Sequence, residues 1–227
     1  FNKAIIDATA EYCVSYKINT AFYESQGIAG WEAMEATLAH IPSTHFTIAD
    51  AKRGDIGNTS AQYAKTFFET LPFDAITVAP YMGKDSIDPF LAYRDKWTIV
   101  LGLTSNPGSQ NFEQQKLANG QFLYESVLEQ VASWGTPEQL MFVIGATKAN
   151  DFESIRKIIP AHFLLVPGVG AQGGSLSEVT KYGKNDAVGL LINASRAVIF
   201  ASSGKDFAED AAIAAKGYAD EMKALLS

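Results

Sequence analysis

Short apolar runs alternate with longer amphipathic stretches along the whole chain, which leaves few folds open to it. Each run has four to eight residues rich in β-branched or large apolar side chains, a pattern typical of strands buried on both faces. Because strict alternation of strands and helices implies right-handed crossover connections, the sequence predicts a parallel sheet. The seven predicted strands lie at residues 12–18, 46–49, 75–79, 97–104, 140–146, 163–169 and 187–192.

Two α/β architectures combine parallel strands with a chain of this length, the open doubly wound sheet and the (β/α)8 TIM barrel. Polar side chains suited to chemistry follow nearly every predicted strand, as in a barrel, whereas an open sheet concentrates them at one point. Residues 1–12 are predicted to form a helix with no strand before it. We therefore expect a single α/β barrel domain over residues 1–227, with seven of eight strands in this chain and the first strand before Phe1.

The overall charge narrows the class of partner. A formal net charge of −7 argues against nucleic acid or an anionic membrane, but it allows an anionic small molecule in a locally positive site. No apolar run approaches the ~20 residues that cross a bilayer. The single cysteine, Cys13, fits a reducing compartment, so we expect a cytoplasmic protein in which this thiol is structural. The three histidines lack metal-ligand spacing, which predicts that no metal is bound.

Residues 50–59, with the sequence DAKRGDIGNT, place several charges directly after the second apolar run. If the strand continues through Ala51, its alternation puts Asp50 and Lys52 on one face. At the mouth of a barrel these two groups would lie a few ångströms apart and keep each other charged. Asp55 follows where the chain turns. A solvated surface loop is the alternative for such a charge run, but the position at a strand end favours an active site.

A glycine-rich segment ends the sixth predicted strand. Gly168, Gly170 and Gly173 have the G-x-G-x-x-G spacing of dinucleotide-binding folds. That motif should open a long helix, and the residues that follow are too few and too polar for one. A glycine-rich loop near the end of a barrel is typical of a phosphate site instead. We predict that its backbone N–H groups and Gln172 bind phosphate together with Arg196, for which a surface ion pair is the alternative.

Two further strand ends carry candidate binding residues. Ser105 lies in the turn after the fourth predicted strand, where its hydroxyl is placed to read the edge of a base. Lys17 lies at the end of the first predicted strand. Such a lysine commonly covers apolar surface with its stem, and a role in a ligand or charge network is equally open when a carboxylate faces it.

Four motifs, DAKRGDIGNT, LTSNPGS, PGVGAQGG and NASR, together resemble the orotidine 5′-phosphate decarboxylases, most of all their second bacterial subfamily. The resemblance implies a barrel of the ribulose-phosphate-binding type that converts orotidine 5′-monophosphate (OMP) to UMP in pyrimidine biosynthesis without a cofactor. It implies a homodimer in which Asp55 and Thr59 reach the partner's site. The family's ribose-binding aspartate would lie on the strand before Phe1. The implied roles are catalysis by Lys52, Asp50 and Asp55, and substrate binding by Lys17, Thr59, Ser105, Gln172, Gly170 and Arg196.

Two alternatives to this activity stay open. Magnesium-dependent sugar-phosphate decarboxylases and aldolases of the same barrel group share a D-x-K-x-x-D strand, but they usually add an acidic residue on the neighbouring strand, where this chain has Lys17. A barrel that binds UMP without turnover would not need the charges of Asp50, Lys52 and Asp55. The sequence favours metal-free decarboxylation, in which the Lys52 cation stabilises and then protonates a carbanion at C6 of the pyrimidine.

Overall fold

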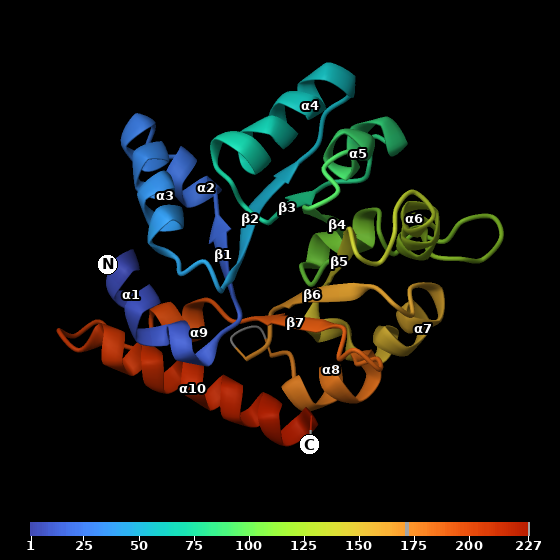
Figure 1. Cartoon of the computed structure of the whole chain (residues 1–227). Coiled ribbons are helices and arrows are strands. Elements are labelled where there is room, and N and C mark those ends of the chain that lie inside the picture. Colours follow the sequence, from blue (N-terminus) through green and yellow to red (C-terminus); the bar gives the residue numbers. More distant parts are fainter. Residues whose placement is uncertain (171–172, 227) are drawn as a thin grey trace.

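The computed structural model of the chain describes residues 1–170 and 173–226 and contains one sheet of seven parallel strands. Strands pair in the order in which they occur in the sequence, so that β1 and β7 form the two edges. Figure 1 shows this sheet curled into a nearly closed barrel with the helices around it. The strands are β1 (Ser15–Asn19), β2 (Phe46–Arg53), β3 (Ala75–Val78), β4 (Trp97–Leu103), β5 (Leu140–Ile144), β6 (Phe163–Pro167) and β7 (Leu190–Asn193).

Helices form the connections between these strands and the two ends of the chain. The helices are α1 (Asn2–Thr9), α2 (Ala21–Glu24), α3 (Ile28–His40), α4 (Gly57–Lys65), α5 (Lys84–Leu91), α6 (Leu123–Ala132), α7 (Phe152–Ile158), α8 (Leu176–Gly183), α9 (Arg196–Ile199) and α10 (Phe207–Leu226). Short 3-10 turns lie at η1 (Ala10–Tyr12), η3 (Pro107–Asn111) and η4 (Ala146–Asp151), and η2 (Thr66–Thr70) is a π turn that extends α4.

The predicted barrel and all seven predicted strands are confirmed, although the strand boundaries shift by one to four residues. The largest shift is at β2, which runs on to Arg53, four residues beyond its predicted end, whereas β5 and β6 each end two residues early. The first strand begins three residues later than predicted because residues 10–12 continue the N-terminal helix as a 3-10 turn. The last strand also begins three residues late. There, Asn185 and Val188 exchange backbone hydrogen bonds of 3.1 and 3.0 Å, which close a turn before Leu190. Apolar residues in these turns extend the strand pattern upstream of the residue at which each strand actually begins.

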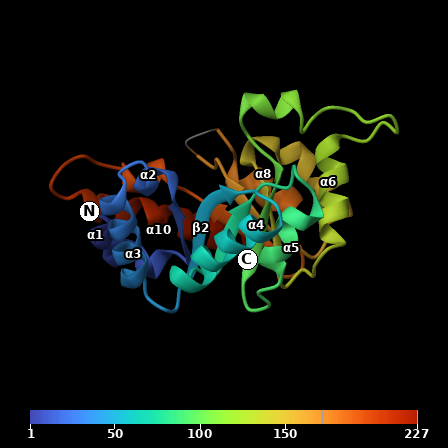
Figure 2. The ribbon, with the colours of Figure 1, turned by 90° about the horizontal axis from the view of Figure 1, so that it is seen from above.

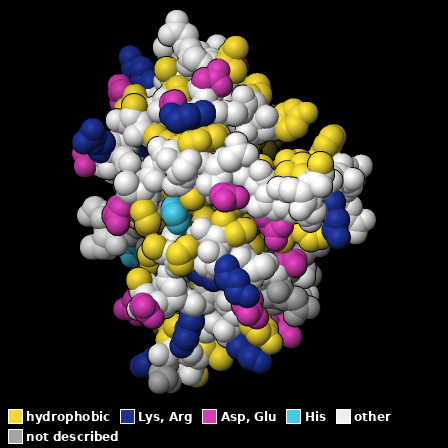
Figure 3. All heavy atoms as spheres, turned by 90° about the vertical axis from the view of Figure 1, so that its right-hand side faces the viewer, with side chains coloured by type: hydrophobic (Ala, Val, Ile, Leu, Met, Phe, Trp, Pro, Cys, Tyr) yellow, Lys and Arg dark blue, Asp and Glu magenta, His cyan; other side chains and the backbone are white. Residues whose placement is uncertain are grey.

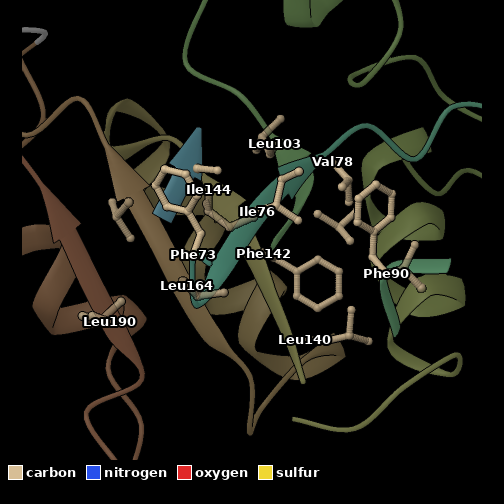
Figure 4. Packing of buried hydrophobic residues seen from close by; sticks show 14 of the residues in the cluster. Phe73, Ile76, Val78, Phe90, Leu103, Leu140, Phe142, Ile144, Leu164 and Leu190 are labelled. Carbon is tan, nitrogen blue, oxygen red and sulfur yellow. The ribbon is translucent and has the colours of Figure 1, made fainter. Parts of the chain in front are cut away.

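The core has two layers, one on each face of the barrel sheet. Alternate strand residues fill the interior of the barrel, among them Ile48, Ile99 and Leu165, each 3% exposed or less. The residues between them face the helices. Figure 4 shows Phe142 of β5 lying toward Phe90 of α5, and both side chains are at most 1% exposed. Burial on both faces explains why the strands appear in the sequence as continuous apolar runs.

The C-terminal helix α10 packs against the N-terminal helix α1. Figure 1 shows it running past α8 and α9 to α1, and the rings of Phe1 and Phe207 stack with their centroids 5.1 Å apart. Among the residues described, no helix combines the length and the apolar character that crossing a bilayer requires. In Figure 3, positive and negative side chains are interspersed over the face that α5, α6 and α7 form.

His162, immediately before β6, makes the stability of the fold depend on pH. Its side chain is 6% exposed, and its ring nitrogens have no hydrogen-bond partner among the described residues. Burial, and then the nearby Arg156 cation, lower the pKa of His162 below its ordinary value of 6.5, while Glu138 opposes this change. Because the folded protein binds this proton less tightly than the unfolded chain, the free energy of unfolding should fall as the pH drops from about 7 to below the lowered pKa.

The variant His162→Phe isolates this contribution, since the ring packs edge-on against Phe142 at 5.3 Å and phenylalanine can keep that contact. Denaturant titrations of both proteins between about pH 7 and 5 should show a steeper loss of unfolding free energy for the wild type. Equal slopes would mean that His162 does not titrate differently in the two states.

Candidate active site

Asp50 lies at the centre of a charged cluster at the carboxyl end of β2. Its Oδ2 accepts a hydrogen bond from Lys17 Nζ of β1 at 2.6 Å, and its Oδ1 accepts one from Lys52 Nζ at 2.5 Å. The Asp50 and Lys17 side chains are 9% and 11% exposed, whereas Lys52 is 49% exposed. The predicted proximity of Asp50 and Lys52 is therefore confirmed, and Lys17 joins them. Of the three, Lys52 is by far the most exposed to solvent.

The backbone at Lys52 departs from the regular strand on which its position was predicted. Lys52 has a φ of 47°, in the left-handed region that residues other than glycine rarely adopt. The pairing of β2 with β3 is irregular between Ala49 and Arg53. Lys52 thus reaches Asp50 through a bulge rather than through simple alternation. Strained backbone of this kind costs about 1–3 kcal/mol and is concentrated at functional sites.

The electrostatics of the cluster favour the charged form of Asp50. Burial by itself would raise the pKa of this carboxyl, but the Lys17 ammonium, through its charge and its hydrogen bond, and then Lys52 more than offset that effect. The net result is a pKa below the ordinary 3.8. Asp50 is therefore an anion at neutral pH, held between two ammonium groups.

Arg53, next to Lys52 in the sequence, serves the fold instead. It pairs with Glu24 of α2, and its guanidinium lies over the rings of Tyr63 and Phe67, 5.3 and 5.4 Å from their centroids. Arg53 therefore fastens the end of β2 to the surrounding helices. Only Lys52 of this pair of cations belongs to the charged cluster.

Asp55 and Thr59 lie outside the charged cluster in this chain. Asp55 Oδ1 accepts a hydrogen bond from the N–H of Ile56 at 2.7 Å, just before α4. Thr59 is exposed in the first turn of that helix. Within the described part of the chain, no salt bridge joins Asp55 to the lysines around Asp50. Both side chains are accessible beside the mouth of the barrel.

A cavity of about 180 Å³ adjoins the charged cluster on the side of β6 and β7. Lys17 lies in its wall and is thus shared between the cavity and the cluster. Arg196, the first residue of α9, supplies a second cation. The cavity is lined by Lys17, Pro167, Gly168, Val169, Asn193, Ser195 and Arg196. Two cations beside a glycine-rich loop make this cavity suited to an anion.

The glycine-rich loop is closed on itself by backbone hydrogen bonds. Gly170 N–H donates to the carbonyl of Gly174 at 3.0 Å, and Gly174 N–H donates to that of Gly168 at 3.2 Å. Gly170 has a φ of 73°, and a Cβ there would lie 2.3 Å from Tyr218 Oη of α10. Glycine is therefore required at this position for steric reasons, and its N–H is already engaged. Gln172, the other predicted ligand on this loop, lies outside the described residues.

Ser105 lies on a braced loop after β4. The Glu113 carboxylate accepts hydrogen bonds from the Thr104 N–H at 2.7 Å and from its hydroxyl at 2.8 Å. Ser105 packs against Gly145, where an added Cβ would lie 2.8 Å from the serine Cβ. The segment between β4 and α6 extends away from the barrel in Figures 1 and 2. Ser105 is thus held near the base of a projecting loop.

Sequence patterns do not single out Thr77 of β3, which the structure places in the cluster. Its hydroxyl lies 3.1 Å from Asp50 Oδ1 and 3.0 Å from the backbone nitrogen of Lys52. Threonine is a common residue in strands, so its presence in the apolar run at residues 75–79 carries no signal of its own.

Comparison with known proteins relates this geometry to a family. Residues 2–211 match the orotidine 5′-phosphate decarboxylase / HUMPS family. The whole chain aligns with orotidine 5′-phosphate decarboxylases from Bacteroides fragilis, at 56% identity over 85% of that protein, and from Flavobacterium johnsoniae, at 58% identity over 84%. The structure of Leishmania donovani OMP decarboxylase superposes on 99% of this chain and 85% of its own, with a TM-score of 0.90 and 36% identity. The chain belongs to the orotidine 5′-phosphate decarboxylase / HUMPS family.

Proposed function

We propose that the chain decarboxylates OMP to UMP in pyrimidine biosynthesis without a cofactor. The observation that carries this proposal is the Asp50 carboxylate held between Lys17 and Lys52 at 2.6 and 2.5 Å. Lys17 also lies in the wall of the cavity that contains Arg196. The Lys52 cation thus lies beside a cavity suited to an anion. OMP requires this arrangement, because it carries a reacting carbon at one end and a phosphate at the other.

Lys52 has the position and exposure to act on the reacting carbon. Loss of CO₂ breaks the bond between C6 and the carboxylate carbon and leaves the electron pair on C6. The Lys52 ammonium stabilises this carbanion, then donates a proton from Nζ to C6 and becomes neutral. Since 49% of its side chain is exposed, it regains a proton from solvent after product release. Asp50, next to the substrate carboxylate, holds the Lys52 ammonium in place and disfavours the ground state.

The remaining predicted residues bind the substrate away from C6. Arg196 and Gln172 of the glycine-rich loop contact the phosphate, Gly170 shapes that loop through its positive φ, and Ser105 reads the pyrimidine edge. The cavity of about 180 Å³ beside Arg196 supports the first assignment. The phosphate is remote from the bond that breaks, so its binding energy orders the site and raises the rate of the chemical step.

The mouth of the barrel supports a homodimer in which Asp55 and Thr59 serve the partner's site. Ile56, beside Asp55, is 55% exposed. Tyr81 and Phe112, after β3 and β4, are 84% and 65% exposed, with ring centroids 6.3 Å apart. Exposed apolar side chains near the active site are typical of protein interfaces. Mixing inactive Lys52→Ala subunits with inactive Asp55→Ala subunits should restore part of the activity, and no recovery in a mixed dimer would contradict this arrangement.

We also infer a cytoplasmic location, which the soluble substrate and product support. Cell fractionation tests this inference directly, and recovery of the protein in a membrane fraction would overturn it.

Turnover of OMP in EDTA tests the function and separates it from magnesium-dependent chemistry. Both carboxylate oxygens of Asp50 are occupied by ammonium groups, at 2.5 and 2.6 Å, so a divalent cation would have to displace a lysine. We expect the purified protein to release CO₂ from OMP at the same rate with and without EDTA. Activity that disappears in EDTA and returns with Mg²⁺ would contradict the mechanism, and a folded protein that binds UMP without turnover would contradict the function.

A further inference from the structure

Thr77 connects the two central residues of the charged cluster from the neighbouring strand. Its side chain is fully buried on the interior face of β3. The hydroxyl oxygen accepts a hydrogen bond from the Lys52 backbone N–H at 3.0 Å, and the hydroxyl donates one to Asp50 Oδ1 at 3.1 Å. These directions are fixed, because a backbone N–H can only donate and an ionised carboxylate can only accept. One hydroxyl therefore sets the relation between the Lys52 backbone and the Asp50 carboxylate.

The Lys52 N–H makes this bond where the regular strand ladder is interrupted. Ala49 pairs with Ile76 and Arg53 pairs with Val78, so β2 advances four residues while β3 advances two. The extra length forms the bulge in which Lys52 adopts its φ of 47°. The hydroxyl of Thr77 takes the place of a ladder carbonyl as the partner of this N–H. A strained conformation persists only when its surroundings hold it, and this bond is a direct restraint on it.

We propose that Thr77 is a positioning residue for the decarboxylation, which holds the bulge at Lys52 and the carboxylate of Asp50 so that the Lys52 ammonium faces the reacting carbon. This inference rests on the proposed function. Thr77 acts through the two charged residues and does not itself bind substrate. A displacement of about 1 Å in such a group can lower a rate roughly 10²-fold.

Thr98, on the next strand, provides a matched control. It is also a threonine in a buried strand and is 1% exposed. It lies between Trp97 and Ile99, which face the barrel interior, and so points to the opposite face of the sheet. Among the described residues its hydroxyl has no hydrogen-bond partner. Replacing either threonine by valine removes one buried hydroxyl from the sheet, but only Thr77→Val removes a contact to the cluster.

Steady-state kinetics with OMP test the inference on Thr77→Val, Thr77→Ser and Thr98→Val. For Thr77→Val we expect kcat to fall roughly 10²-fold with little change in KM, because the phosphate and pyrimidine contacts are untouched. Serine keeps the hydroxyl, so Thr77→Ser should recover most of the rate. Thr98→Val should match the wild type. A merely structural role for Thr77 would lower only the amount of folded enzyme, so kcat is referred to the sites that titrate with UMP, and per folded molecule it would then be unchanged.

A crystal structure of Thr77→Val adds a readout that does not depend on activity. We expect Lys52 to leave the left-handed region or its ammonium to move away from Asp50. If Thr77→Val is too unstable to purify, the same measurements on Thr77→Ala apply. Unchanged kcat, or an unchanged cluster geometry, would overturn the inference, whereas a folded wild type without OMP turnover would count against the proposed function instead.

Discussion

Replacing Lys52 by alanine is expected to lower kcat for OMP by roughly 10⁴-fold or more. The change removes the proton donor and the cation that faces the carbanion, two effects that each contribute at least about 10²-fold in enzymes. Asp50 keeps its 2.6 Å hydrogen bond to Lys17, so the buried carboxylate stays paired and the fold is preserved. The loss should therefore appear in the chemical step, as CO₂ release in single-turnover experiments.

Binding of UMP is the control that separates catalysis from recognition. The cavity with Lys17 and Arg196 does not include Lys52, so Lys52→Ala should retain most of its affinity for UMP. A matched surface variant is Lys157→Ala, whose ammonium forms an exposed i,i+4 pair with Glu153 at 3.3 Å. Such pairs contribute little to stability, and this variant should behave like the wild type. Near-normal turnover by Lys52→Ala would refute the role of Lys52.

The sequence predicts the parts of the site that depend on residue type and strand position. Buried runs identify the seven strands, and the ends of parallel strands meet at one edge, which brings Lys17, Asp50 and Arg196 to one side of the barrel. The bulge at Lys52 could not be predicted, because it arises from a mismatch in length between two strands that are distant in sequence. The hydroxyl of Thr77 was missed for the same reason. The position of this hydroxyl beside Asp50 and Lys52 depends on the register of β3 against β2, and the sequence of one strand alone does not determine that register.

Arg156 of α7 makes hydrogen bonds that sequence patterns also do not reveal. They lie at the end of the barrel opposite the active site. Its guanidinium donates to four backbone carbonyls, those of Gly183 at 2.5 Å, His162 at 2.6 Å, Gly189 at 2.8 Å and Ile159 at 3.3 Å. These carbonyls end α7 and α8 and precede β6 and β7. Burial lowers the pKa of Arg156 to about 10, so it remains a cation at neutral pH.

Replacing Arg156 by methionine is expected to lower the free energy of unfolding by about 3 kcal/mol or more. Methionine fills part of the volume but removes the guanidinium donor from all four carbonyls, of which that of Gly189 still accepts the Leu164 N–H at 2.9 Å. Each buried carbonyl left unsatisfied costs about 1–3 kcal/mol. Arg156→Lys should recover only part of the loss, since one ammonium cannot span the positions that the planar guanidinium reaches. Urea unfolding curves measure both, with the exposed Arg94→Met as the matched control, expected within about 0.5 kcal/mol of the wild type.

The same variant also tests whether the two ends of the barrel are independent. In barrels of this type the carboxyl ends of the strands carry the chemistry and the opposite end carries stability. Arg156→Met should therefore keep a normal kcat per folded molecule at low temperature while it loses the folded state more readily in urea. A loss of less than about 1 kcal/mol would show that water satisfies these carbonyls as well as the guanidinium does. A loss of kcat in the folded variant would instead show that the loops at this end control the geometry around Asp50.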